Sequence, residues 1–451
     1  MRAPRNQRLT PRRSFLAGAA AIGGAWLSGC ASRCIEFPTR PPQLDAQLNP
    51  QSGSRPVTAS KDVPTYFPEL HGFCDGVAEV SAYEREQRWA RAQKLLADAG
   101  LGALIVEAGP THGYFAPTTW RRSERPLLMV LPASGPPIWV GPAFEEGRIV
   151  EKLGHNRVLT WQEDASPYAR AGDALRSAGV AKSATVGVDP DARGFVIAGL
   201  RGALGARRVV LAGEVVDGCR MVKTAPELDR LRRANEATKA ALQAAAQHLT
   251  PGMHEDTFAD LVREAQMQAG LRDIWALVLF GPNASFPHGT DERRPLHEGE
   301  LVLVDTGGSL HGYRSDITRT WAIGSIPDNL RTAWETVLTA QTAALAKIRP
   351  GASCAEVDGA ARQVITQAGY GTGFEQFTHR LGHGIGLQVH ERPYLRPANP
   401  RVLKPGMTMS NEPGIYVPGA FGVRIEDIVA VTADGVEVFG PRAKSLEAPF
   451  G

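Results

Sequence analysis

The sequence lacks the features that mark several common classes of protein. It has few cysteines, and none of them has the spacing of a zinc site: Cys30, Cys34, Cys74, Cys219 and Cys354. The apolar run from about residue 15 to 27 is too short to span a membrane stably. Without the five arginines of residues 1–29 the formal net charge of +3 becomes −2. No basic surface remains to indicate nucleic-acid binding.

The composition is that of a folded protein. With 451 residues, 43% hydrophobic and 22% charged, the chain has enough apolar material for two globular domains. This balance excludes a disordered protein.

Residues 1–30 have the order of parts found in an export signal. A basic start with Arg12 and Arg13 precedes the apolar run, which ends in LSGC. This segment resembles a twin-arginine lipoprotein signal, in which Cys30 would be lipidated. The alternative is an ordinary secretory signal with an incidental cysteine. We therefore expect an exported protein, anchored by lipid to a membrane of the bacterial cell envelope, and a disulfide is compatible with that setting.

The rest of the chain divides into a tether and two domains. Residues 31–75, rich in Pro, Ser and Gln, are predicted to be a flexible tether. Residues 76–218 are predicted to form an α/β domain, with a helix beginning at a capping box of Ser81 and Glu84. Its strand candidates are GALIVE, PLLMVLP, PIWVG and ATVGVD.

Residues 219–451 are predicted to form a second domain with an internal repeat. A capping box of Thr224 and Glu227 begins a long helix that ends before Pro251. Two segments share the same order of a turn, an amphipathic helix and an Ala-Gly stop. They are PGMHEDTFADLVREAQMQAGL, which starts at Pro251, and PGASCAEVDGAARQVITQAGY, which starts at Pro350. Common helix-stop chemistry could produce this likeness by coincidence. The alternative is two similar halves related by a pseudo-two-fold axis, with a site between them.

Several acidic residues interrupt or border segments that otherwise read as apolar strands. In LVLVDTGGSLHGYRSDITRTWAIG, a turn of residues 309–312 would place Asp305 opposite Asp316, where like charges repel. A cation between them would remove that cost. Further along lie His379, His383 and His390, followed by two acids at strand edges, Glu412 and Glu426. Four carboxylates and a histidine suit two divalent cations such as Mn, Fe, Co or Zn.

These motifs together resemble the pita-bread metallopeptidases, the family of methionine aminopeptidases, prolidases and aminopeptidase P. Two Asp, one His and two Glu bind a dinuclear centre there, and the matching motifs here are VDTG, SDITRT, GHGIG, NEPG and RIED. The metal ligands implied by the resemblance are Asp305, Asp316, His383, Glu412 and Glu426. The implied fold is a creatinase/prolidase-like α/β domain followed by an α+β pita-bread domain with a pseudo-two-fold repeat.

The resemblance also implies a mechanism and an additional set of residues. Asp316 and Glu426 would bridge two metal ions, with Mn expected first, and Glu412 would accept a proton as a metal-activated water attacks the substrate. Further residues match positions that face the substrate: His288, His379, His390 and Arg424. For each histidine the alternative is a packed polar group, and for Arg424 a surface arginine.

The N-terminal domain narrows the choice of activity. Methionine aminopeptidases lack such a domain, whereas prolidases and aminopeptidase P carry one, and creatinase lacks the metal ligands. We therefore expect hydrolysis of the bond between an N-terminal residue and proline. A non-peptide substrate and a non-catalytic binding role are the alternatives. Dipeptides and longer peptides both remain candidates, and members of the family often form homo-oligomers through the N-terminal domain.

Overall fold

The computed structural model describes residues 67–154 and 157–451. The predicted signal and most of the predicted tether lie outside the described residues. Residues 67–75, which we assigned to the tether, are instead packed: η1 (Pro68–Leu70) begins this segment, and Phe67, Leu70 and Cys74 join a buried apolar cluster. Among the residues described, no helix is long and apolar enough to cross a membrane.

The N-terminal domain contains a mixed six-stranded sheet in the order β4-β3-β2-β1-β5-β6. The strands are β1 (Leu101–Glu107), β2 (Leu128–Pro132), β3 (Ile138–Pro142), β4 (Arg157–Trp161), β5 (Thr185–Val188) and β6 (Val209–Leu211). The strands predicted from GALIVE, PLLMVLP, PIWVG and ATVGVD are confirmed as β1, β2, β3 and β5. They read as continuous apolar runs because both faces of the sheet are covered.

Helices cover this sheet on both faces. One apolar cluster contains side chains of α1 (Ala82–Asp98), α2 (Pro110–Phe115), α3 (Glu146–Leu153) and α6 (Gly213–Arg220). The other contains side chains of α4 (Pro167–Ser177) and α5 (Gly194–Ala203). At the start of α1 the Ser81 side chain accepts a hydrogen bond from the Glu84 backbone, but the Glu84 carboxylate binds Arg88 and Arg230. Only half of the predicted capping box is therefore formed.

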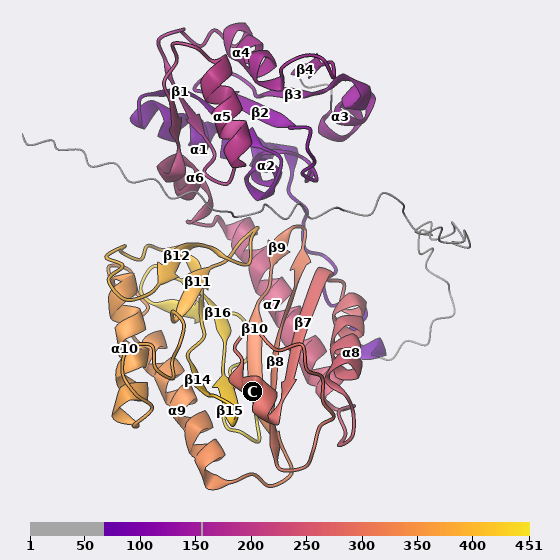
Figure 1. Cartoon of the computed structure of the whole chain (residues 1–451), viewed down its shortest axis with the longest axis vertical. Helices are drawn as coiled ribbons and strands as arrows, with labels where there is room; N and C mark the ends of the chain where they lie inside the picture. The colour runs from indigo at the N-terminus through magenta and orange to yellow at the C-terminus, as the bar shows by residue number, and fades with distance from the viewer. Residues whose placement is uncertain (1–66, 155–156) are drawn as a thin grey trace, which may run out of the picture. The chain divides into compact units, whose positions relative to one another are not determined.

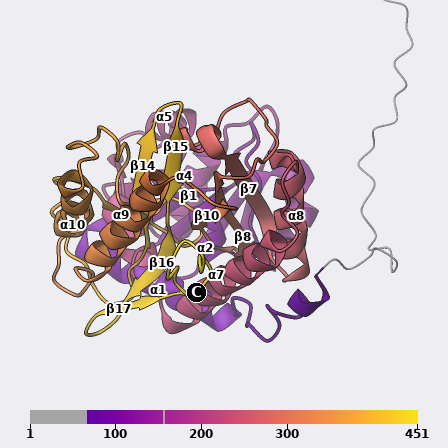
Figure 2. The same cartoon turned by 90° about the horizontal axis from the view of Figure 1, so that it is seen from below.

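The second domain places strands between two pairs of helices (Figures 1 and 2). The first half comprises α7 (Ala225–Ala246), α8 (Glu255–Gln268), β7 (Arg272–Phe280), η3 (Gly281–Ser285), β8 (Glu300–Leu310), β9 (Tyr313–Arg314) and β10 (Ile317–Ile323). The second half begins with α9 (Asp328–Leu345) and α10 (Cys354–Gln367). Its strands are β11 (Gly382–Gly384), β12 (Glu391–Leu395), β13 (Thr408–Asn411), β14 (Gly414–Val417), β15 (Phe421–Arg424), β16 (Asp427–Val431) and β17 (Val436–Val438).

The predicted repeat coincides with two helices in equivalent places. α8 and α10 span Glu255–Gln268 and Cys354–Gln367, so both of their ends are offset by the same 99 residues. Side chains of α7 and α8 pack in one cluster with β7 and β8, while side chains of α9 and α10 pack in another with β13, β15 and β16. The strands of the two halves thus lie between the helix pairs, where ligands from both halves can converge.

The predicted pairing of Asp305 with Asp316 is wrong by two residues. The hairpin turn is His311–Gly312, both with positive φ (50° and 86°), and Asp305 pairs with Thr318. A two-residue turn of this kind matches the twist of a hairpin, so it replaces the four-residue turn that we expected. Because side chains alternate with a period of two, the shift leaves Asp305 and Asp316 on the same face.

Candidate metal centre

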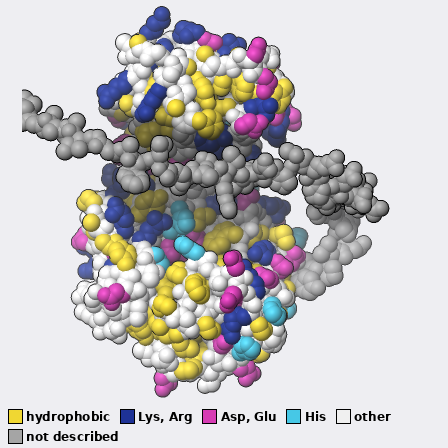
Figure 3. All heavy atoms as spheres, in the orientation of Figure 1, with side chains coloured by type: hydrophobic (Ala, Val, Ile, Leu, Met, Phe, Trp, Pro, Cys, Tyr) yellow, Lys and Arg dark blue, Asp and Glu magenta, His cyan; other side chains and the backbone are white. Residues whose placement is uncertain are grey.

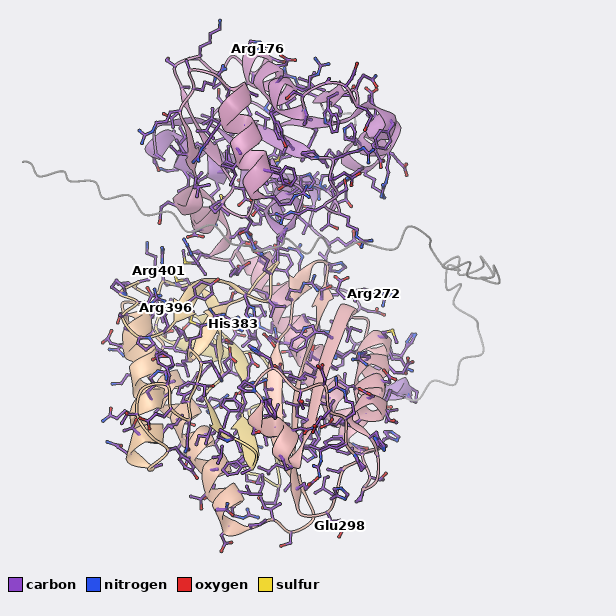
Figure 4. All side chains as sticks on the ribbon, in the orientation of Figure 1. Arg176, Arg272, Glu298, His383, Arg396 and Arg401 are labelled. Atoms are coloured by element: carbon purple, nitrogen blue, oxygen red, sulfur yellow. The ribbon has the colours of Figure 1, made fainter. Side chains whose placement is uncertain are left out.

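Three of the predicted ligands come together in the interior of the second domain. Asp316 lies between β9 and β10, His383 on β11, and Glu426 between β15 and β16. One ligand atom from each of the three lies within 4.8 Å of the others, and all three side chains are buried. His383 is labelled in Figure 4, among the strands of the second half. The group therefore takes residues from both halves of the domain.

Glu412 and Asp305 lie beside this group. The Nε2 atom of His383 lies 3.2 Å from Glu412 Oε1 and 3.5 Å from Asp316 Oδ2. Asp305 Oδ2 accepts a hydrogen bond of 2.5 Å from Arg424 Nη2. The charges of Asp305 and Glu412 also act on the carboxyl group of Asp316. The structure thus brings all five predicted ligands into one neighbourhood, in which Asp305 and Glu412 are partly buried.

Thr318 joins the two halves at this point. Its side chain donates to Glu426 Oε2 (2.8 Å), and its backbone carbonyl accepts from the Glu426 N–H (3.0 Å). Because Thr318 is the strand partner of Asp305, these bonds hold Glu426 beside the hairpin that carries both aspartates. We did not predict this residue, since a threonine within a strand carries no distinguishing signal in the sequence.

Polar side chains also fix the other ligands. Asn235 on α7 accepts a hydrogen bond from the Asp316 N–H (3.2 Å). The Ser410 hydroxyl accepts from the His383 N–H (2.9 Å) and donates to Glu412 Oε1 (2.9 Å). Each contact limits the freedom of a ligand before any cation binds, which is how the residues around a metal site orient its ligands.

Two carboxyl groups of the centre are strongly disfavoured as anions. Burial raises the pKa of Asp316 well above its usual range, and the charges of Glu426 and Asp305 raise it further. Burial does the same to the pKa of Glu426, with the charges of Glu412 and Asp305 adding to it. Without a cation, this centre therefore favours protonated carboxyl groups.

The other two acids have cationic neighbours. Burial raises the pKa of Asp305, although Arg424 opposes the rise. For Glu412, burial is outweighed by the hydrogen bond and charge of His383, which lower its pKa to about 2. Glu412 is therefore a carboxylate at neutral pH and can accept a proton.

The residues fit a centre for divalent cations. Asp305 Oδ1 and Glu426 Oε1 are buried and have no hydrogen-bond partner. Buried carboxylate oxygens without partners are costly unless something binds them. Carboxylates together with one imidazole suit Mn, Fe, Co or Zn. A cation would supply both the missing partners and the missing positive charge.

The three additional histidines differ in their surroundings. The His379 Nδ1 lies 2.7 Å from the Arg380 carbonyl, and Nε2 lies 2.9 Å from the Tyr416 hydroxyl. A carbonyl can only accept, so Nδ1 carries the proton and Nε2 accepts from Tyr416. Both nitrogens are thus engaged within the protein, which favours the packed alternative for His379. Burial lowers its pKa to about 4.

His390 and His288 remain open to a substrate. The His390 ring stands perpendicular to that of His383, with centroids 4.1 Å apart. Burial of part of the ring and the neighbouring His383 lower the pKa of His390 to about 4, so it is neutral at pH 7. His288 is exposed, and its charge acts on His390. Histidine side chains show at the surface of the face drawn in Figure 3.

Arg424 is buried inside the centre. Only 3% of its surface is exposed, which rules out the surface alternative. Besides Asp305, its guanidinium donates to the hydroxyl groups of Tyr416 (2.8 Å) and Thr318 (2.9 Å). Tyr416, which we did not predict although it lies in NEPGIYVPG, therefore connects Arg424 to His379.

Arg424→Lys is expected to lower kcat/KM at least about tenfold, because lysine keeps the charge but cannot replace a planar fork of donors. The variant should still bind divalent cations, since the five ligands remain. Kinetics and metal analysis of the same preparation check this. The matched control is Arg331→Lys, at an exposed ion pair with Glu447. Equal activity of the two variants would contradict a role for the Arg424 fork.

Comparison with known proteins gives matches to both domains. Residues 229–433 match the model of metallopeptidase family M24, and residues 88–222 match the model of the creatinase/prolidase N-terminal domain. The first range contains all five predicted ligands.

Individual relatives cover most of the chain. The probable dipeptidase PepE of Mycobacterium tuberculosis is 39% identical over 363 residues, which is 79% of this chain and 94% of that protein. The crystal structure of dipeptidase PepE from Mycobacterium ulcerans superposes with a TM-score of 0.76 at 36% identity, covering 82% of this chain and 98% of that one. The Xaa-Pro dipeptidase of Lactobacillus delbrueckii subsp. lactis is 42% identical over 231 residues, covering 51% of this chain and 62% of that protein.

Proposed function

Because the chain belongs to metallopeptidase family M24 and is an enzyme of the prolidase type, we propose that it hydrolyses the bond between an N-terminal residue and proline with two metal ions. The observation that carries the proposal is the buried group of Asp316, His383 and Glu426, drawn from both halves of the domain, with Asp305 and Glu412 beside it and two unpartnered carboxylate oxygens. Proline lacks an N–H and fixes φ, so general peptidases cleave such bonds poorly and a dedicated enzyme has a role.

The proposed centre assigns a task to each residue. Two divalent ions, with Mn as the first candidate, would be held by Asp305, Asp316, His383, Glu412 and Glu426, and would activate a water and polarise the scissile carbonyl. Glu412, an anion at neutral pH, accepts the proton released as the water attacks. His390, neutral and facing outward beside His383, donates a hydrogen bond to the substrate carbonyl.

The names of the relatives favour dipeptides over longer substrates. PepE is named a dipeptidase and the Lactobacillus relative an Xaa-Pro dipeptidase. We therefore propose Xaa-Pro dipeptides as the substrate class.

The assay supplies Mn²⁺ to protein lacking residues 1–30 and reads products by mass spectrometry. Its substrates are an Ala-Pro dipeptide, the matched Ala-Ala dipeptide and an Ala-Pro-Ala tripeptide. The proposal predicts cleavage of Ala-Pro well above that of Ala-Ala. Preferred cleavage of the tripeptide would instead assign an aminopeptidase P activity, and equal cleavage of Ala-Pro and Ala-Ala would remove the proline specificity.

We also propose export and lipid anchoring through Cys30, on the strength of the sequence RRSFLAG followed by LSGC. Mass spectrometry of the mature protein from membranes should find a modified Cys30 at its N-terminus. An unmodified N-terminus at another residue would reject the anchor.

A further inference from the structure

We infer that Arg220 and Lys223, at the junction of the two domains, position His390 by holding the carboxylate of the adjacent Glu391. The inference rests on the proposed function, because it concerns how a substrate-facing histidine is held. It makes the N-terminal domain part of the active-site framework.

Two basic side chains bind the carboxylate of Glu391 in the interior of the protein. Its Oε2 atom lies 2.6 Å from Arg220 Nη2, and its Oε1 atom lies 2.8 Å from Lys223 Nζ. Arg220 and Lys223 are each 6% exposed and Glu391 is 8% exposed. Burial would raise the pKa of Glu391, but Lys223 and Arg220 together hold it below its usual value. Arg220, Lys223 and Glu391 therefore form a buried ion-pair group, which we call the Glu391 clamp.

Arg220 connects this clamp to the N-terminal domain. Its Nη1 donates to the Thr111 hydroxyl on α2 (3.0 Å), and its Nη2 also donates to Gln388 Oε1 (2.7 Å). One guanidinium thus links α2 and α6 to two residues of the turn that contains His390. A lysine ammonium cannot reach these partners with the same fixed geometry.

The clamp fixes the turn against the backbone that carries His383. Gly384, the next residue, pairs with Glu391 across β11 and β12. A Cβ atom at Gly386 would lie 2.5 Å from Glu391 Oε1, so the carboxylate sits where only a glycine leaves room. His390 is the residue before Glu391, and its ring contacts that of His383. Movement of the Glu391 carboxylate would therefore move His390 relative to His383.

The clamp also forms part of the wall of a cavity of about 190 Å³ that His390 lines. Its lining also includes Asp189 and Asp191 of the N-terminal domain, which follow the carboxyl end of β5. His390 therefore borders a space lined by residues of both domains.

A second buried ion pair provides the matched control. Arg230, 2% exposed, binds both oxygens of Glu84 on α1 at 2.8 and 2.9 Å, and so also joins the two domains. It also donates to the carbonyls of Ala78 and Glu79 and lies over the ring of Tyr313. Arg230→Gln removes an equally buried interdomain arginine without touching the turn of His390.

The first measurement follows histidine ring signals by NMR in protein labelled with ¹⁵N-histidine, and it does not depend on substrate. His390→Ala and His383→Ala assign the two signals. Arg220→Gln is expected to shift the signals of His383 and His390, whereas Arg230→Gln should leave both in place. Unchanged signals in Arg220→Gln, or the same shifts in both arginine variants, would overturn the inference even if the enzyme proves to be an Xaa-Pro dipeptidase.

The second measurement is a double-mutant cycle in Mn²⁺-loaded protein. Arg220→Gln should lower kcat about tenfold or more at unchanged metal content, and Arg220→Lys should restore little of it. In the His390→Ala background the additional loss should shrink to less than about twofold, because residues that act as a unit are not additive. If Arg220→Gln lowered kcat in the His390→Ala background by the full factor seen in the wild type, Arg220 would act elsewhere. The same conclusion would follow if Arg220→Gln lowered kcat while His390→Ala stayed fully active.

Discussion

Asp316→Asn is expected to lower kcat/KM by at least about 10³-fold, which corresponds to about 4 kcal/mol of transition-state stabilisation. Asp316 lies inside the centre: it shares the 4.8 Å group with His383 and Glu426, and the charges of Asp305 and Glu412 act on its carboxyl group. An amide supplies no negative charge to hold the proposed divalent cations. Activity and bound metal, measured on one preparation, should fall together.

The fold of this variant should survive the substitution. In the metal-free protein the raised pKa of Asp316 means that folding at neutral pH must protonate this buried acid, and a neutral amide removes that cost. Thermal unfolding in chelator should show Asp316→Asn to be at least as stable as the wild type. Asp260→Asn, on the exposed side of α8, is the control and should change neither property. An Asp316→Asn protein that retains wild-type turnover would contradict the metal mechanism.

Removal of divalent cations is expected to abolish activity reversibly and to lower the free energy of unfolding. A ligand that binds only the folded protein contributes about 2.7 kcal/mol at 100 times its Kd and about 4.1 kcal/mol at 1,000 times its Kd. The unpartnered oxygens of Asp305 and Glu426 identify where that free energy would be gained. Denaturant unfolding with and without chelator measures it, and Mn²⁺ added back should restore both properties. Full activity after exhaustive chelation would contradict this expectation.

The chelated protein should also show a characteristic dependence on pH. The folded-state pKa of Asp316 and that of Glu426 are raised above the unfolded value of about 4, so between these values the folded protein binds more protons. Its stability from this source is complete below about pH 4 and declines as pH rises toward the folded-state values. His379 and His390, whose pKa values are lowered to about 4, act in the opposite direction between about pH 4 and 6.5.

A comparison with Asp316→Asn isolates the acidic residues, because both proteins contain the same histidines. The difference in unfolding free energy should move in favour of the variant as pH rises above about 4. Denaturant unfolding in chelator at a series of pH values measures this difference. A difference that does not change with pH would show that the pKa of Asp316 is not raised in the folded protein.

Part of the proposed centre could be located from sequence because its acidic residues stand out against their surroundings, and the family resemblance supplied the set of five ligands. Asp305 interrupts an apolar strand, and Glu412 and Glu426 stand at strand edges, where charged side chains need a reason. The helices of the repeat were also predictable, since α8 and α10 carry the same stop signals at the same offset. The exact strand register was not, because a two-residue and a four-residue turn keep the same face of the hairpin buried.

Interactions between distant segments could not be read from the sequence. Glu84 has the spacing of a capping box with Ser81, yet its carboxylate binds Arg230, 146 residues away. Arg220 and Glu391 are 171 residues apart and form a buried ion pair that no local sequence pattern predicts. Tyr416 and Thr318 likewise gain their roles from Arg424, which reaches both of them only in the folded protein.

An anomalous difference map from crystals of the Mn²⁺-loaded protein, recorded at the manganese edge, would locate the bound metal ions directly. We expect two peaks among Asp305, Asp316, His383, Glu412 and Glu426, with Asp316 and Glu426 contacting both. A single peak would contradict the dinuclear centre. Peaks elsewhere in a fully active protein, with none among these five residues, would contradict the metal centre itself.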